Sequence, residues 1–234
     1  MSELLFNELP RPTFRWLRVN HTVSSLAGED TAVQSIAVEA NKDILSPLPV
    51  GTALLDGNYE GANKEAVHVL VEKAEGYAIN VPPKAKEVVG IRIDANARVA
   101  NRFQFIVGEG AELEVQFYVT GSGDALTNVS YLNEYDVKEA GKVVVKKVNL
   151  LPEHVQHIEH RYTKLEEKAD VEYINIEIGG SENILNYYHD LVGQESRMVH
   201  DIAYLGNKEQ KFDISMVIIS LISCLVALGT LGSV

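Results

Sequence analysis

Four short stretches decide the fold of this chain: Glu109-Gly-Ala-Glu-Leu113, Glu139-Ala-Gly-Lys-Val143, Glu167-Lys-Ala-Asp-Val171 and Glu195-Ser-Arg-Met-Val199. Each places a glutamate four residues before an aliphatic residue, and successive glutamates are separated by 30, 28 and 28 residues. Alternating apolar residues follow each stretch, which is typical of strands. A turn followed by a strand, recurring at a fixed period, predicts a β-solenoid whose rungs stack their aliphatic residues on one another.

The segments before this repeat favour further strands and a less regular beginning. Runs rich in β-branched and aromatic residues predict strands at Val67–Val71, Val88–Ile93 and Phe103–Val107. Near the start of the chain, the apolar cluster Leu4–Leu9 predicts a short helix, and the prolines after it predict an extended segment.

These patterns predict a mainly β protein built around a right-handed parallel β-helix. An antiparallel sandwich with evenly spaced turns remains the alternative, because a single sequence does not separate the two. We expect a small N-terminal α+β region at residues 1–66, the β-helix core at 67–213 and an uncharged apolar tail at 214–234.

The composition excludes several classes of function. The 234 residues include 33 acidic and 21 basic side chains, so the net charge of -12 would repel nucleic acid. Cys224 is the only cysteine, so no intrachain disulfide can form and a reducing cytoplasm is expected. The first residues, Met1–Phe6, carry an acid instead of the basic start of a signal peptide.

Histidines form the densest group of potential metal ligands. His154, His157 and His160 lie in a segment that reads as a strand, where alternating side chains point to opposite faces and do not converge on a metal. We therefore expect solvated or locally hydrogen-bonded imidazoles. His189 and His200 each precede an aspartate, but no nucleophile motif accompanies them, so packed or surface positions are expected.

No other motif points to catalysis or to a bound cofactor. Gly121-Ser-Gly-Asp124 is too short for a phosphate-binding loop and predicts a turn, and Glu166 and Glu167 read as a solvated face. A solenoid enzyme would need converging acidic and basic groups or hexapeptide repeats, and neither is found. The prediction is a protein that is not an enzyme.

The uncharged stretch from Ile214 to Val234 has open interpretations. Its 21 residues would span a ~30 Å bilayer core as a helix, although serines and glycines dilute its hydrophobicity and no basic flank follows. Phe212–Ile219 alternatively forms a further buried strand, with the rest a foreign or truncated terminus. A membrane is therefore not an expected partner, and membrane anchoring is kept only as the alternative.

Several segments, taken in order, resemble the SufB/SufD family of scaffold subunits in SUF iron–sulfur cluster assembly. They are Gly76–Lys84, Ile106–Val115, Glu167–Tyr173, Ile178–Glu182, Leu191–Glu195 and Gln210–Asp213. The resemblance covers about residues 76–213, and Leu9–Pro12 with Trp16 look like the family's N-terminal entry. It implies a β-helix without catalytic activity, an iron–sulfur cluster as context, and two partners: a SufC-type ABC ATPase and a sister SufB/SufD subunit.

The resemblance is closer to SufD, because SufB-type members usually add cysteine-bearing segments. Family members continue past this length into further rungs and a helical segment that docks the ATPase, so a truncated or frame-shifted chain that binds the ATPase poorly is expected. No cluster-binding residue is transferred, and Cys224 lies outside the matching segments. The alternative function is a membrane-tethered β-solenoid binding domain anchored by residues 214–234.

Overall fold

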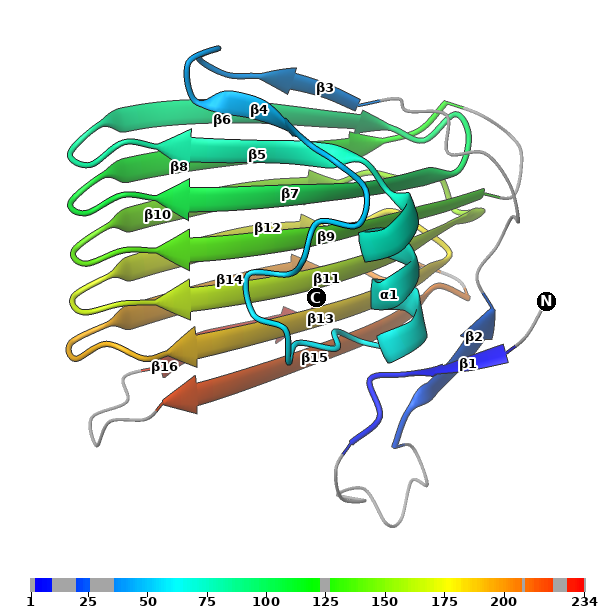
Figure 1. Ribbon diagram of the computed structural model, residues 1–234. Coiled ribbons are helices and arrows are strands. Elements are labelled where there is room, and N and C mark those ends of the chain that lie inside the picture. Colours follow the sequence, from blue (N-terminus) through cyan, green and yellow to red (C-terminus); the bar gives the residue numbers. More distant parts are fainter. Residues whose placement is uncertain are drawn as a thin grey trace.

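The computed structural model describes residues 3–9, 20–25, 36–122, 127–207, 209–220 and 227–233. The chain folds as a parallel β-solenoid of about five turns, which confirms the fold class predicted from the repeat. Each full turn contributes one strand to each of two sheets, and the strands stack in chain order (Figure 1).

The first of these sheets is parallel from β6 onward. We call it the even-strand sheet after its parallel strands β6 to β16, and we call the other the odd-strand sheet after its parallel strands β5 to β15. β3 pairs antiparallel with β6 at its edge. In spatial order its strands are β3 (Ile36–Glu39), β6 (Lys86–Asp94), β8 (Glu112–Thr120), β10 (Lys142–Asn149), β12 (Asp170–Glu177), β14 (Arg197–Tyr204) and β16 (Ala227–Ser233).

The odd-strand sheet lies opposite and has the same organisation, with β4 paired antiparallel to β5 at its edge. Its strands are β4 (Leu45–Leu48), β5 (Gly76–Val81), β7 (Val99–Val107), β9 (Thr127–Val137), β11 (Val155–Leu165), β13 (Glu182–Leu191) and β15 (Lys211–Ser220). Because consecutive neighbours from β5 to β15 are parallel, the antiparallel sandwich considered from the sequence is wrong.

Tight turns join β5 to β6, β7 to β8, β9 to β10, β11 to β12 and β13 to β14 along one side of the stack (Figure 1). The residue two positions before each of β6, β8, β10, β12 and β14 has a positive φ: Lys84, Gly110, Ala140, Lys168 and Glu195. The amides of the first four donate along the stack, as from Gly110 N to Glu139 O at 2.9 Å. A ladder of hydrogen bonds thus runs through the turns as well as through the sheets.

The structure corrects the last unit of the predicted repeat by one residue. Lys168 N donates to Gln194 O, so Gln194 takes the place of the glutamates in the earlier turns and Glu195 has the positive φ. Val171 consequently pairs with Met198, which is buried, and not with Val199. Starting from Leu113, the residues that pair between successive strands of the even-strand sheet are therefore 30, 28 and 27 positions apart in the sequence.

Two segments outside the β-helix also differ from the sequence predictions. Val67–Val71 lies within α1 (Lys64–Lys73) and is not a strand; Asn63 caps this helix through a bond from Ala66 N to its side chain at 2.9 Å. The helix buries Ala66, Val67 and Leu70 together, a grouping that helical spacing provides.

The predicted helix at Leu4–Leu9 is wrong as well. β1 (Glu3–Phe6) instead pairs antiparallel with β2 (Thr22–Ser25) and places Phe6 in a buried cluster with Ala62, Ile158 and Ile184. The partner strand is remote in sequence, so local propensity did not reveal this pairing.

The described part of the tail continues the solenoid. β15 extends through Ser220 in parallel register with β13, which confirms a further strand at Phe212–Ile219, although its side chains are only partly buried. β16 pairs with β14. These residues thus form strands where a membrane-spanning helix was the competing interpretation.

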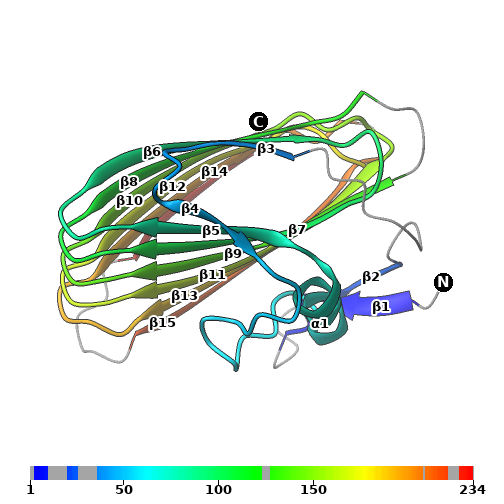
Figure 2. The same ribbon diagram turned by 45° about the horizontal axis from the view of Figure 1, so that its top comes forward.

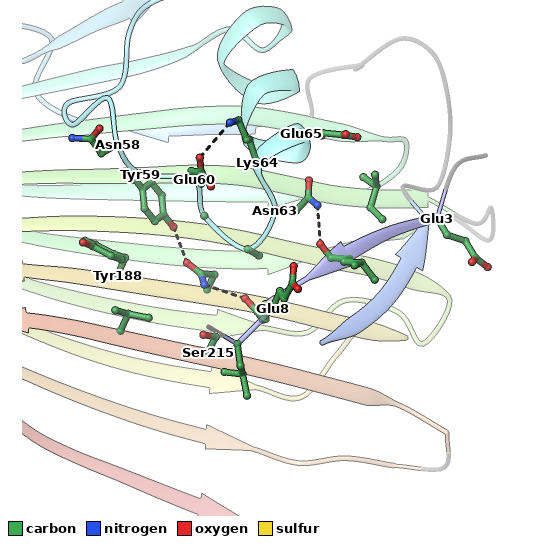
Figure 3. A pocket seen from close by; sticks show the side chains of 18 residues that line it. Glu3, Glu8, Asn58, Tyr59, Glu60, Asn63, Lys64, Glu65, Tyr188 and Ser215 are labelled. Carbon is green, nitrogen blue, oxygen red and sulfur yellow. Dashed lines mark hydrogen bonds and ion pairs between the residues drawn. The ribbon is translucent and has the colours of Figure 1, made fainter. Parts of the chain in front are cut away.

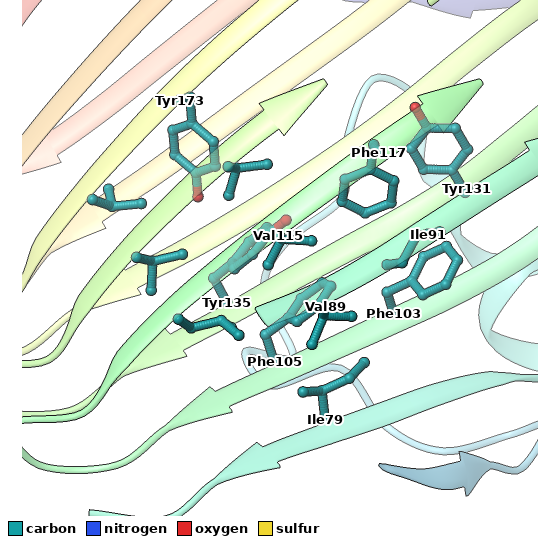
Figure 4. Packing of buried hydrophobic residues seen from close by; sticks show 14 of the residues in the cluster. Ile79, Val89, Ile91, Phe103, Phe105, Val115, Phe117, Tyr131, Tyr135 and Tyr173 are labelled. Carbon is teal, nitrogen blue, oxygen red and sulfur yellow. The ribbon is translucent and has the colours of Figure 1, made fainter. Parts of the chain in front are cut away.

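The two sheets meet at the tight turns and diverge toward the opposite side (Figure 2). Aliphatic and aromatic side chains fill the interior near the turns and through the early rungs (Figure 4), with Phe105 stacked on Tyr135 at 4.6 Å between ring centroids. Longer polar side chains, including Lys147, Arg161 and Tyr187, are fully buried in the later rungs.

Candidate functional site

β11 carries the residues that organise the polar interior. Alternation along a strand points every second side chain to the same face, and His157, Glu159, Arg161 and Thr163 all point into the β-helix. All four are fully buried. At the corresponding inward positions of β7 and β8 the chain has mostly valine, leucine and phenylalanine, so the later rungs replace an apolar filling with a polar one.

Four buried charges pair with one another at the centre of this interior. Lys147 of β10 forms ion pairs with both Glu159 and Glu177. Arg161 donates to Glu159 Oε1 through Nη2 at 2.6 Å and through Nε at 3.0 Å. The two cations and two carboxylates come from three strands and are all inaccessible to solvent. Paired burial of this kind avoids the large desolvation cost of an isolated buried charge.

The environment shifts the pKa values of the two buried carboxyl groups, Glu159 and Glu177, in opposite directions. Burial acts to raise the pKa of Glu159, but Arg161 and Lys147 outweigh it and hold that pKa well below its usual range. Burial raises the pKa of Glu177, which Lys147 only partly offsets. Glu159 is therefore the stable anion of the network.

A polar chain extends from this centre through His157. His157 Nδ1 lies 3.1 Å from Asn149 Nδ2 and 3.2 Å from Asn183 Oδ1, and its Nε2 lies 3.0 Å from the Tyr131 hydroxyl. Tyr131 in turn donates to Glu159 Oε2 at 3.4 Å. Burial, with Lys147 nearby, lowers the pKa of His157 to about 3, so the imidazole is neutral at physiological pH.

Aromatic rings enclose the guanidinium of Arg161. Its central carbon lies 4.3 Å from the ring centroid of Tyr173 and 4.4 Å from that of Tyr187, which is a cation–π sandwich. His189 and His200 pack beside these tyrosines, with their own ring centroids 5.6 Å apart. Burial lowers the pKa of both histidines, to about 3 for His189.

A second charged pair lies on the outer face of the odd-strand sheet. Arg102 contacts Glu134 at 3.2 Å, and both are buried beneath the segment 52–55. Arg102 donates to Thr52 O at 2.8 Å, while Glu134 accepts from Leu55 N at 2.8 Å. This pair attaches the N-terminal segment to the sheet.

An open groove of about 850 Å³ lies between β1, the loop before α1 and the outer faces of β13 and β15 (Figure 3). Its floor includes Tyr59, which donates to Asn186 Oδ1 at 3.1 Å. Its rim is acidic, and its lysine, Lys64, pairs with Glu60 at 3.5 Å. The polar groups on its floor bond one another, which suits a surface that orders the N-terminal segment.

The histidines predicted to lie on a strand do not form a metal site. His157 and His160 lie on β11 and point to opposite faces, and His154 precedes the strand. His160 accepts from Ala62 N at 3.0 Å, directly beneath Gly61, where an added Cβ would come within 2.5 Å of the imidazole. No group of three potential metal ligands occurs within the described ranges.

The remaining predicted positions behave as expected where they are described. His189 and His200 are packed in the interior. Glu166 and Glu167 lie at a turn and pair with Lys138 and Lys168 respectively. Gly121 and Ser122 belong to a connection whose following residues, Gly123 and Asp124, lie outside the described residues, as does Cys224.

Sequence reasoning missed the paired charges Lys147, Glu159, Arg161 and Glu177. A signal was present, because each charge occupies a position in a strand where period-2 alternation calls for an inward side chain. Such a position marks a buried charge that needs a partner, but the partner cannot be named before the register between rungs is known.

No helix in the described parts of the chain has the length and apolar character needed to cross a bilayer.

Comparisons with known proteins give one match. No curated protein and no solved structure matches the chain. Residues 91–222 match the family described as "SUF system FeS cluster assembly, SufBD core domain", a span that runs from within β6 to just past β15 and covers more than half of the chain. With the stacked parallel rungs and their polar interior, this match shows that the chain belongs to the SufBD core domain family of the SUF iron–sulfur cluster assembly system.

Proposed function

We propose that this chain is a non-catalytic, SufD-like scaffold subunit of a SUF-type iron–sulfur cluster assembly complex. The observation that carries the proposal is the family match over residues 91–222, which spans most of the β-helix, from within β6 to just past β15. The chain would act in the cytoplasm with a sister SufB-type subunit and a SufC-type ABC ATPase, and the cluster would be the cargo of the assembly.

The interior supports a scaffold in preference to an enzyme. Lys147, Glu159, Arg161 and Glu177 pair with one another, and none lines the grooves described on the surface. A catalytic acid or base must reach its substrate, so groups enclosed and paired in this way suit a structural role. Their joint effect is to connect β10, β11 and β12 rigidly.

The cysteine content supports the SufD-like assignment. Thiolates are the usual ligands of iron–sulfur clusters, and one cysteine supplies at most one of the four that a cluster takes. A sister subunit would therefore have to contribute most of the ligands. We expect the chain alone to hold no cluster.

Co-purification with a SufB-type subunit and a SufC-type ATPase tests this proposal. The expected result is a complex in which iron and acid-labile sulfide load only when the SufB-type subunit is present. The isolated chain should hydrolyse no ATP and release no sulfur from cysteine. Stoichiometric cluster absorption by the chain alone, or failure to join the SufB-type subunit, would contradict the proposal.

A further inference from the structure

Two rows of side chains face each other inside the later rungs of the β-helix. On the odd-strand sheet, Tyr135, Thr163 and His189 are direct partners on β9, β11 and β13 and point inward. On the even-strand sheet, Tyr173 of β12 pairs with His200 of β14. The ring centroid of Tyr173 lies 5.7, 5.4 and 5.1 Å from those of Tyr135, His189 and His200. Tyr173 thus contacts groups of both sheets.

Arg161 lies against the same ring and leaves one of its nitrogens unpaired. Its central carbon is 4.3 Å from the ring centroid of Tyr173. Its Nε and Nη2 donate to Glu159, and Nη2 also donates to Asn175 Oδ1 at 3.3 Å. The remaining nitrogen, Nη1, is buried and has no hydrogen-bond partner within the described ranges. Two guanidinium N–H groups therefore lack an acceptor.

The position of the proton on His200 follows from its neighbours. A guanidinium only donates, so the Asn175 amide turns its oxygen toward Arg161 and its nitrogen toward His200 Nε2, which accepts. Burial, with Arg161 nearby, lowers the pKa of His200, so the imidazole is neutral and its proton is on Nδ1. This Nδ1 is buried and has no partner among the residues that the structure describes.

His189 and Tyr135 add two further donors. Both ring nitrogens of His189 are buried without a partner in the described part of the chain, so its N–H lacks an acceptor whichever nitrogen carries it. The buried hydroxyl of Tyr135 is unpaired in the same way. Buried polar groups are nearly always hydrogen-bonded, and unpaired ones indicate a bound water or ion. We call these side chains the donor group: Tyr135, Arg161, His189 and His200.

The balance of donors and acceptors in the donor group indicates an anion. Arg161 Nη1 offers two N–H groups, and the other three side chains offer one N–H or O–H each. Only the second ring nitrogen of His189 has to accept. A water molecule must also place its own two protons, for which one acceptor is too few, whereas an anion accepts from every donor. A cation is disfavoured because Arg161 would repel it.

The buried charges agree with this assignment. Lys147 and Arg161 are two buried cations. Glu159 is a stable anion, but burial raises the pKa of Glu177 and favours the neutral form of that carboxyl group. A monovalent anion beside Arg161 would balance the second cation, and buried charges that are balanced avoid a large desolvation cost.

We propose that the donor group binds one small monovalent anion, of the size of chloride, inside the β-helix. The ligand has to be small, because the whole donor group is buried and the rings of Tyr173 and Tyr187 enclose the guanidinium of Arg161. The bound anion connects β9, β11, β13 and β14 across successive rungs. This inference does not depend on cluster assembly.

Urea unfolding of the full chain in sodium bromide tests the proposal, with sodium gluconate keeping the ionic strength constant. Bromide that binds only the folded chain should lower the unfolding equilibrium constant about tenfold for each tenfold rise in its concentration above the dissociation constant. Gluconate is too large for the buried site and should have no such effect. Unfolding that does not depend on bromide would overturn the proposal.

Matched substitutions locate the effect. Tyr135→Phe removes one donor, so the same stabilisation should need several-fold more bromide. Tyr162→Phe removes a hydroxyl on the outer face, which donates to Asp56 at 3.0 Å, and should leave the bromide dependence unchanged. Circular dichroism checks that both variants fold, and His189→Phe takes the place of Tyr135→Phe if that variant does not. A bromide dependence equal to that of the unaltered chain in the donor-group variant would reject the site.

Crystals of the unaltered chain grown in bromide give a direct check by anomalous scattering. The expected result is one anomalous peak in contact with Arg161 Nη1 and enclosed by the donor group. Bromide peaks confined to the surface would show adventitious ions only and reject the site. Water molecules at this position would assign the unpaired donors to bound water instead and would likewise overturn the proposal.

Discussion

Glu159 is the residue on which the buried charges of the β-helix converge. It contacts Lys147 and Arg161 directly and accepts a further bond from Asn133 at 3.0 Å. A pair of this kind contributes little net stability compared with an apolar replacement, but removal of one member leaves an uncompensated charge in a dry interior. The network is therefore sensitive to single substitutions.

Glu159→Gln should destabilise the fold by about 3–5 kcal/mol, because Arg161 loses its anionic partner and Lys147 keeps only Glu177. Urea unfolding followed by circular dichroism gives the change in free energy. Glu114→Gln is the control, since Glu114 pairs with Lys146 at 2.9 Å on the surface and should cost less than about 1 kcal/mol. Similar costs for both variants would show that the buried charges do not depend on one another.

At the scale of single elements, the tight turns carry backbone strain that the sequence accommodates unevenly. The same turn position has a φ of 61° at Gly110 and 54° at Ala140. Glycine adopts this region without steric penalty, whereas an L-residue is strained there by about 1–2 kcal/mol. Neighbouring rungs thus place a glycine and an alanine at the same turn position with nearly the same φ.

Gly110→Ala should cost about 1 kcal/mol, and Ala140→Gly should be neutral or slightly stabilising because relief of strain offsets the greater freedom of the unfolded chain. A Cβ at Gly110 would come no closer than 3.7 Å to Lys84, so the test isolates backbone conformation from packing. Thermal unfolding of the two variants measures the difference. A stabilising Gly110→Ala would contradict the turn geometry.

The capping residue of α1 connects two elements of the N-terminal region. Asn63 accepts from Ala66 N at 2.9 Å and donates to Leu5 O at 2.7 Å. Asn63→Ala should therefore cost about 1 kcal/mol and speed hydrogen exchange in α1 while the β9 amides stay protected. Asn58→Ala, in the same exposed loop, should change neither; unchanged α1 exchange in Asn63→Ala would argue against the cap.

The helix α1 also shows where sequence patterns mislead at this scale. Val67-His-Val-Leu-Val71 has the β-branched alternation of a strand. The cap at Asn63 and the burial of Val67 and Leu70 against the odd-strand sheet select a helix instead. Tertiary packing outweighed a weak local preference.

At the scale of the whole molecule, buried histidines couple folding to pH. Burial lowers the pKa of His157 and His189 to about 3 and that of His160 to about 4, compared with 6.5 in an exposed imidazole. The unfolded chain therefore binds more protons than the folded chain between these values and pH 6.5. Their contribution to stability is complete above pH 6.5 and is lost as the pH falls through this window.

Burial also lowers the pKa of His200, so four histidines take up protons in the unfolded chain over this range. The free energy of unfolding should fall between pH 6.5 and pH 5, by at most about 5.5 kcal/mol per pH unit for four protons. Glu177 and Glu134, whose pKa values burial raises, oppose part of this loss. Denaturation at several pH values measures the slope. His189→Phe should reduce the slope by about one proton's share, and an unchanged slope would show that His189 is not buried in its neutral form.

The sequence by itself determined that this protein is mainly β, with short strands and tight turns. Alternation along each strand and small residues at the turns are local features, and their repetition near every 28 residues favoured a solenoid over an antiparallel sandwich. It also placed His157 and His160 on one strand with opposite directions, because a strand reverses its side chains at each step.

Only the tertiary structure decided which charges pair and which surfaces are covered. Stacked rungs bring three strands into register, and this register places Lys147 beside Glu159 and Glu177. If one strand paired one residue further along, every side chain of that strand would point to the opposite face. The sequence repeat gave such a one-residue error for β14, where Val171 pairs with Met198 and not with Val199. Likewise, α1 covers part of the odd-strand sheet, where its Leu70 packs with Leu132 and Tyr162. These contacts join residues far apart in the chain, so no local pattern specifies them.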